Sequence, residues 1–447
     1  MRAGVAVVDI TPSVGTELSG GAFGPARGVL HPLQAKLLCL EQEGERLLLA
    51  SCDLLGFGEE LAGRIRRAIS RRTGIAHDAI MLACTHTHGG PATVYLRGWG
   101  QPDAAYCDRL TKQLTEASAV AVDSLAPAAV GVGAGECPEI SVNRSFGEEG
   151  GTNDQLTALR VDGEGGEPLA LLVNYASHPV NLHSVGQVTP DFPYYVQRDV
   201  QQGLAADVPV LYLTGACGDL NPANFRQGEP SEQAAAETGG QIAAAALRLL
   251  EGVQTSSDAE LAFSAIDVKL PLQPLPSREE LEALIDERGA KMAEQQPDPT
   301  NWAYCGHKAA VEWAREALEV IEQGAQQSSK TVTLQAFRIG QAGLVGMPGE
   351  LFSEFGRDIA ASGALEHTFA VTLANGCVGY FPSREAYEIG RYEAVHCPRF
   401  VGLQLFAPEV GERIREGALT VLRQLSYMQR NRRSRQTWGR SCSVIVG

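Results

Sequence analysis

The stretch Thr85-His86-Thr87-His88-Gly89-Gly90-Pro91 follows directly on the apolar run Ala-Ile-Met-Leu-Ala-Cys at positions 79–84. A short apolar run closed by glycine and proline is typical of a buried strand that ends in a loop. Side chains two residues apart lie on one face of an extended chain, so we expect His86 and His88 to reach one site together. Two histidines on a surface turn would explain this stretch equally well, and the choice depends on the rest of the chain.

The same arrangement recurs along the sequence, because apolar runs feed polar loops rich in glycine and proline, with amphipathic helices between them. We expect strands over residues 4–10, 35–40, 46–53, 128–133, 155–161, 169–176, 208–213, 331–338, 342–347 and 368–374, and helices over 59–72, 103–124, 231–251 and 408–425. The pattern predicts a mixed α/β (α+β) fold, a layered catalytic domain built on mixed sheets.

We expect residues 1–426 to form this single domain. Residues 277–324 have a helical pattern broken by Pro297-Asp-Pro299, which predicts a helical insertion over about 275–326. The segment 427–447 carries several arginines and little periodicity, so we expect it to be a disordered basic tail.

The bulk composition limits the possible functions. The 447 residues carry a formal net charge of −16, which argues against a nucleic-acid-binding protein, because such proteins neutralise phosphates with Lys and Arg. No apolar run approaches the ~18 residues of a membrane span, and the N-terminus shows no export signal. The ten cysteines contain no CxxC pair and are expected to be reduced thiols. We therefore expect a cytoplasmic protein.

Polar side chains with catalytic potential follow several of the expected strands. They are Arg144, His178, Asp219, Asn221, Glu350, Tyr380 and Tyr392. Each of them alone has an ordinary structural explanation, such as a buried histidine with its hydrogen bonds satisfied or a glutamate in the first turn of a helix. Their recurrence at the same kind of position favours a shared site. Two histidines and a carboxylate delivered by separate strands are a familiar ligand set for zinc.

Taken together, these residues resemble the catalytic domain of the neutral (non-lysosomal) ceramidases, which are zinc-dependent amidases. The resemblance covers about residues 4–405 and rests on six stretches that occur in the order found in the family. They are Thr85–Pro91, Asn143-Arg144-Ser145, Ser177-His178-Pro179, Gly218-Asp-Leu-Asn-Pro222, Met347-Pro-Gly-Glu350 and the run YFPSREAYEIGRYEA at 380–394.

The resemblance implies that His86, His178, Glu350 and Tyr380 hold a zinc ion and that His88 is a general acid/base. It also implies that Arg144 and Tyr392 orient the substrate and stabilise the oxyanion. The expected reaction is hydrolysis of an amide bond in a small-molecule or lipid-like N-acyl substrate by a zinc-activated water. One position departs from the family, since Asn221 stands where the family has serine and cannot act as a hydroxyl nucleophile.

Other functions remain open from the sequence. Asp53, Asp219 and several histidines could be combined into the two-metal site of a phosphoesterase, for which two ions lie about 4 Å apart. Another ester hydrolase, or a non-catalytic binding protein on the same fold, would also be compatible with these residues. Metal content distinguishes these hypotheses. The amidohydrolase requires one zinc ion, the phosphoesterase requires two metal ions, and the binding protein requires none.

Overall fold

The structure is a computed structural model that describes residues 1–21 and 23–441, with side chains described as far as residue 426. Its large sheet has eight strands in the order β4-β3-β2-β1-β5-β7-β8-β9. Their bounds are β1 (Arg2–Asp9), β2 (Gln34–Gln42), β3 (Glu45–Cys52), β4 (Ile80–Cys84), β5 (Ala126–Glu136), β7 (Gln155–Gly163), β8 (Pro168–Tyr175) and β9 (Val210–Thr214). The β3–β4 and β8–β9 pairs are parallel and the other pairs are antiparallel, so the sheet is mixed.

A second sheet has four strands in the order β11-β12-β13-β15, and two short strand pairs, β6–β10 and β14–β16, lie at the loops. The bounds are β11 (Leu261–Pro271), β12 (Ser329–Ile339), β13 (Ala342–Gly346) and β15 (His367–Val371) for the sheet, and β6 (Ser141–Asn143), β10 (Leu220–Pro222), β14 (Glu350–Leu351) and β16 (Tyr380–Phe381) for the pairs. The two sheets pack face to face, and the largest cluster of buried apolar side chains includes residues from both.

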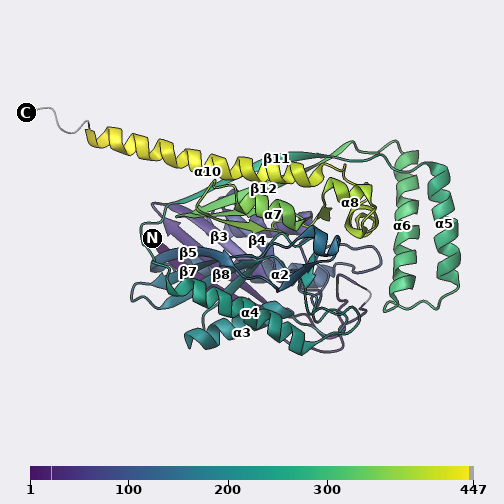
Figure 1. Cartoon of the computed structure of the whole chain (residues 1–447), viewed down its shortest axis with the longest axis horizontal. Coiled ribbons are helices and arrows are strands. Elements are labelled where there is room, and N and C mark those ends of the chain that lie inside the picture. Colours follow the sequence, from purple (N-terminus) through teal and green to yellow (C-terminus); the bar gives the residue numbers. More distant parts are fainter. Residues whose placement is uncertain (22, 442–447) are drawn as a thin grey trace, which may run out of the picture.

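Helices cover the outer faces of both sheets (Figure 1). Helices α1 (Glu59–Thr73), α2 (Ala104–Asp123), α3 (Phe192–Leu204) and α4 (Glu232–Glu251) pack on the large sheet, and α7 (Ser353–Ala360) and α10 (Val410–Ser441) pack on the small one. Two short helices, α8 (Arg384–Glu388) and α9 (Pro398–Val401), lie between them in the chain. The expected layered α/β architecture on mixed sheets is therefore confirmed.

The two ends of the large sheet come together, although β4 and β9 stand at opposite ends of its strand order. The Ser51 hydroxyl donates a hydrogen bond to the Tyr212 carbonyl (2.6 Å), and the Thr214 hydroxyl donates one to the Thr85 carbonyl (2.8 Å). The loops that follow β4, β8 and β9 consequently meet at one place. This curvature brings residues 85–91, 177–183 and 215–222 to a common site.

Helices α5 (Arg278–Ala293) and α6 (Trp302–Glu322) form a hairpin that projects from one end of the molecule (Figure 1). Ser277 caps α5 in a capping box with Glu280, and the two helices pack through Leu281 and Trp313 among others. Pro297 and Pro299 lie in the connection between them.

At the C-terminus, α10 reaches into the segment 427–447 that we expected to be disordered, and residues 442–447 of that segment lie outside the described residues. Within the described chain, no helix combines the length and the apolar character that crossing a bilayer requires.

Candidate metal centre

His86 and His88 lie in the loop after β4, and both turn toward the same site. The strand ends at Cys84, and His86 has a positive φ of 68°, so the two histidines are not strand neighbours on one face as we expected. The left-handed turn at His86 nevertheless brings the two imidazole centroids within 5.0 Å of each other. The expected convergence is present, but a strained loop produces it.

His178 reaches the same site from the loop after β8. It is fully buried, and its ring centroid lies 4.7 Å from that of His86. One ligand atom from each of His86, His88 and His178 can be chosen so that all three lie within 4.8 Å of one another. Among the described residues, these three histidines are the group of His, Cys, Asp and Glu side chains that could hold a metal ion.

The backbone sets the tautomer of all three histidines. The Nδ1 atom lies 2.8 Å from the Leu55 carbonyl oxygen in His86, 3.1 Å from the Gly20 oxygen in His88 and 2.7 Å from the Cys217 oxygen in His178. A carbonyl oxygen only accepts hydrogen bonds, so each Nδ1 carries the proton and each Nε2 presents a lone pair to the site. This arrangement is the usual outer support of a metal-binding histidine.

Burial keeps two of these imidazoles neutral at pH 7. It lowers the pKa of His178 to about 4, and nearby Arg144 adds to the effect. Burial also lowers the pKa of His88 well below its usual range, with a contribution from the other histidines. The Nε2 atoms of His86 and His88 are buried without a hydrogen-bond partner. Buried polar atoms of this kind require a ligand or water, and imidazole nitrogens with free lone pairs suit a metal cation.

Glu350 completes the buried cluster. Its Oε2 atom lies 3.0 Å from His178 Nε2 and 3.2 Å from His86 Nε2. Burial acts to raise the pKa of Glu350, but His86 and His178 together hold it well below its usual range. Two imidazole lone pairs and a carboxylate oxygen are all acceptors, and their close approach favours a cation between them. The donor set therefore fits a divalent metal ion.

Tyr380 stands beside Glu350 because the short strands β14 and β16 pair in parallel, with Glu350 opposite Tyr380. Its hydroxyl accepts a hydrogen bond from Arg144 Nη2 (3.1 Å). Burial and the Glu350 charge raise the pKa of Tyr380 well above its usual range, against the opposing effect of Arg144. The structure thus brings all four proposed zinc ligands, His86, His178, Glu350 and Tyr380, to one site.

Arg144 is held in place by several acceptors. It donates from Nε to Glu393 (3.0 Å), from Nη1 to Asn221 (3.2 Å) and from Nη2 to the Gly218 carbonyl (2.8 Å) as well as to Tyr380. These bonds occupy four of its five N–H groups. Burial disfavours its charge, but the pKa of Arg144 is raised because Tyr380, Glu393 and Glu350 face it. Asn221, at the position where the family has serine, is thus a support for Arg144.

Tyr392 begins a short π-helical turn (Tyr392–His396) and is 42% exposed. Burial of its hydroxyl raises the pKa of Tyr392 well above its usual range, and its expected contact with an oxyanion stays a prediction. Glu393, the next residue, is 3% exposed and binds Arg144. The sequence reasoning did not single out Glu393. The available signal was its position within the 380–394 stretch, as an acidic residue beside Tyr392.

Asp219 lies near the site but binds other residues. None of the hydrogen bonds described for its side chain involves the three histidines. Its carboxylate accepts hydrogen bonds from Asn143 Nδ2 (2.7 Å), the Ser353 backbone N–H (2.7 Å) and the Ser353 hydroxyl (2.8 Å). Asp53 is also engaged elsewhere, with Lys36 Nζ 3.6 Å from its Oδ2 atom. The two carboxylates that a two-metal phosphoesterase site would need, Asp53 and Asp219, therefore bind other residues.

We expect Asp219→Ala to lower the free energy of unfolding by about 3 kcal/mol, because it leaves three buried donors without an acceptor. Urea unfolding followed by circular dichroism measures the change. The matched control is Asp258→Ala, which removes an exposed carboxylate and should stay within about 0.5 kcal/mol of wild type. Equal stability of the two variants would contradict the supporting role of Asp219.

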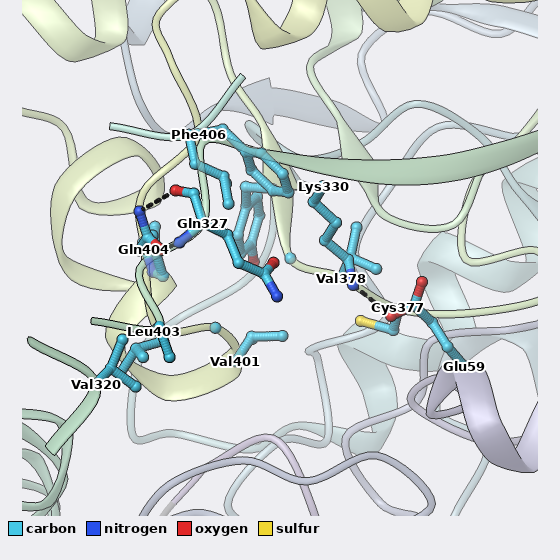
Figure 2. Close-up of a pocket in the computed structure, with 16 residues that line it drawn as sticks. Glu59, Val320, Gln327, Lys330, Cys377, Val378, Val401, Leu403, Gln404 and Phe406 are labelled. Carbon is cyan, nitrogen blue, oxygen red and sulfur yellow. Dashed lines mark hydrogen bonds and ion pairs between the residues drawn. The ribbon is translucent and has the colours of Figure 1, made fainter. Parts of the chain in front are cut away.

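A cavity of about 310 Å³ borders the site, with Tyr380 in its wall. Its lining is mainly apolar and includes Val378, Val401, Leu403 and Phe406. Figure 2 shows two polar pairs on opposite sides of this cavity. In one pair the Gln404 side chain accepts from the Gln327 backbone N–H (2.9 Å), and in the other Lys330 and Glu59 are 2.6 Å apart.

The solved structures with this architecture include two ceramidases. The neutral ceramidase from Pseudomonas aeruginosa superposes with a TM-score of 0.71 at 19% identity, covering 96% of this chain and 74% of that one. A ceramidase solved in complex with C2 gives a TM-score of 0.73 at 18% identity, with 96% and 75% coverage. No protein-family model and no curated protein matches the sequence. With most of both chains covered, this protein has the fold of the neutral ceramidases.

Proposed function

We propose that this protein is a zinc-dependent amidohydrolase of the neutral ceramidase family that cleaves the amide bond of an N-acyl substrate. The observation that carries the proposal is the convergence of buried imidazole Nε2 atoms on the Glu350 carboxylate, with every Nδ1 held by a backbone carbonyl. Such a set of acceptors is costly to bury unless a cation occupies it. The shared fold and the sequence stretches that resemble the family support the same reaction.

In this proposal His86, His178, Glu350 and Tyr380 hold the ion. Zinc supplies Lewis acidity, which makes water available as a nucleophile near neutral pH. Arg144 keeps the Tyr380 hydroxyl in place and adds positive charge beside the reacting carbonyl.

His88 has the geometry of a proton carrier. Its Nδ1 is fixed by the Gly20 carbonyl, and its Nε2 is free to accept a proton from water and donate it to the departing amine. Tyr392, whose hydroxyl lies within the electrostatic range of Arg144 and Glu350, donates its hydroxyl hydrogen to the carbonyl oxygen as negative charge develops there.

The test is metal removal and restoration with a panel of substrates. We expect the purified protein to contain about one zinc ion per chain and to hydrolyse an N-acyl amide such as a fluorescent ceramide. Dialysis against a chelator should remove the activity, and equimolar zinc should restore it. An aryl ester and a phosphodiester serve as the other substrates. Hydrolysis of the phosphodiester alone, or two metal ions per chain, would overturn the proposal in favour of a phosphoesterase.

A further inference from the structure

Aromatic side chains from distant parts of the chain form a continuous group beside the candidate metal centre. The ring centroids of Phe23 and His183 are 5.6 Å apart, and those of Phe23 and Trp302 are 5.7 Å apart. Trp302 lies 5.2 Å from Trp99, which stacks on Phe400 at 3.7 Å. We call these five residues the aromatic wall. Trp302 is the first residue of helix α6, so the helical insertion contributes to the wall.

Hydrogen bonds through Gly20 connect the aromatic wall to His88. The Gly20 carbonyl accepts from His88 Nδ1, and the Gly20 N–H donates to the Trp99 carbonyl (3.3 Å). Phe23 lies three residues after Gly20, in the loop between β1 and β2. His183 lies five residues after His178, in the loop that follows β8. The wall therefore begins within a few residues of two histidines of the cluster, on both sides of it.

Trp302 is held closely against this loop and yet keeps an open edge. A side chain at Gly21 would come within 2.6 Å of the Trp302 ring, so only glycine allows this approach. Trp302 nevertheless remains 39% exposed. Tryptophan side chains that are partly packed and partly open are enriched at interfaces, where one end is apolar and the other is wet.

The insertion itself is anchored to the body of the protein. Arg97 Nε donates to Glu316 of α6 (2.9 Å), and the Trp313 indole N–H donates to the Leu403 carbonyl (2.7 Å). These bonds fix the position of α6, and with it the position of Trp302. The insertion is thus suited to present a side chain to the site in a defined place.

Several buried polar atoms in the same region have no hydrogen-bond partner within the protein. The indole nitrogen of Trp99, the hydroxyl of Ser19 and Nε2 of His88 are all buried without a hydrogen-bond partner. Ser19 precedes Gly20 and lies against Gly100, next to Trp99 in the chain. Buried donors in native proteins are almost always satisfied, so these groups require partners from solvent or substrate.

We propose that Trp302 is a specificity-determining residue of this site and that it selects substrates with a long, unbranched hydrocarbon chain next to the scissile amide. The inference rests on the proposed amidohydrolase function and assigns the helical insertion a part in it. The wall offers ring faces and no carboxylate, lysine or arginine, so it matches an apolar chain better than a charged group. The Trp99 indole N–H is then a hydrogen-bond donor available to the amide group at the end of that chain.

The first experiment compares two chain lengths in three proteins. Wild type, Trp302→Ala and Tyr304→Ala are assayed with N-acetyl and N-lauroyl versions of one fluorogenic amide. Trp302→Ala should lower kcat/KM for the lauroyl substrate about tenfold and leave that for the acetyl substrate within about twofold. Tyr304→Ala, on the same helix turn but outside the wall, should change neither. Trp302→Leu should recover most of the lauroyl activity. An equal loss on both substrates in Trp302→Ala and Trp302→Leu would overturn the inference.

The second experiment measures binding without hydrolysis. A lauryl ether that lacks the amide is titrated into the same proteins, and tryptophan fluorescence reports its binding. The dissociation constant should rise about tenfold in Trp302→Ala and stay unchanged in Tyr304→Ala. If no amide is cleaved but this difference is seen, the proposed reaction is wrong while the assignment of Trp302 stands. Equal affinity in wild type and Trp302→Ala would contradict the assignment even in an active enzyme.

Discussion

Glu350→Gln is expected to purify with little zinc and to lose about 10³-fold in kcat/KM toward an N-acyl amide. The substitution keeps the size of the side chain and removes the charge that lies 3.0 Å from His178 Nε2 and 3.2 Å from His86 Nε2. A neutral amide oxygen is a weaker ligand than a carboxylate, and the cluster then has only imidazoles and Tyr380 to hold a divalent ion. Elemental analysis and steady-state kinetics on the same preparation measure the two effects.

Glu354→Gln is the control for this experiment. It makes the same chemical change four residues later, in the first turn of α7 and outside the proposed site. Its zinc content and activity should equal those of wild type. Wild-type zinc in Glu350→Gln, with activity also retained, would show that Glu350 is no ligand. It would also remove the main reason for placing the ion between the two buried histidines.

His88→Gln is expected to keep about one zinc ion per chain and to lose about 10²–10⁴-fold in kcat, the usual contribution of a general acid/base. The expectation follows from the assignment of His86, His178, Glu350 and Tyr380 as the ligands, which leaves His88 Nε2 free to move a proton. In the structure all three histidines are close enough to share an ion. The experiment therefore decides between a proton carrier and a third imidazole ligand.

His178→Gln provides the comparison, because it should lose zinc and activity together. His77→Gln, at an exposed position away from the cluster, is the matched control and should change neither. If His88→Gln loses zinc as His178→Gln does, the ion is held by three histidines, and Glu350 becomes the candidate base. Full turnover in His88→Gln would exclude both roles for His88.

Much of the fold could be predicted from local sequence alone. The apolar runs 35–40 and 46–53 around Gly44 form the antiparallel pair β2–β3, and the run 79–84 forms β4. These elements follow from short continuous apolar runs and from the restricted conformations around the glycine and proline residues that bound them, and both signals act within a few residues. The layered α/β class follows in turn, because each apolar face must be covered by another element.

The way in which His86 and His88 converge could not be predicted in this manner. Their spacing suggested two neighbours on one strand face, but the strand ends at Cys84 and His86 turns into a left-handed conformation. That conformation is unfavourable for a residue with a Cβ atom and persists because of contacts made elsewhere, such as the bond from His86 Nδ1 to the Leu55 carbonyl.

The candidate ligands and their place after apolar runs can be read directly from the sequence, and they are His86, His178, Glu350 and Tyr380. Their meeting at one site depends on long-range contacts, since the ends of the large sheet come together at Thr214 and Thr85 and the β14–β16 pair sets Glu350 against Tyr380. The same holds for Trp302, which joins the aromatic wall from an insertion more than 200 positions after His86. Local patterns encode single elements, whereas the side chains that meet at a site are set by sheet curvature and long-range packing, in which many residues take part.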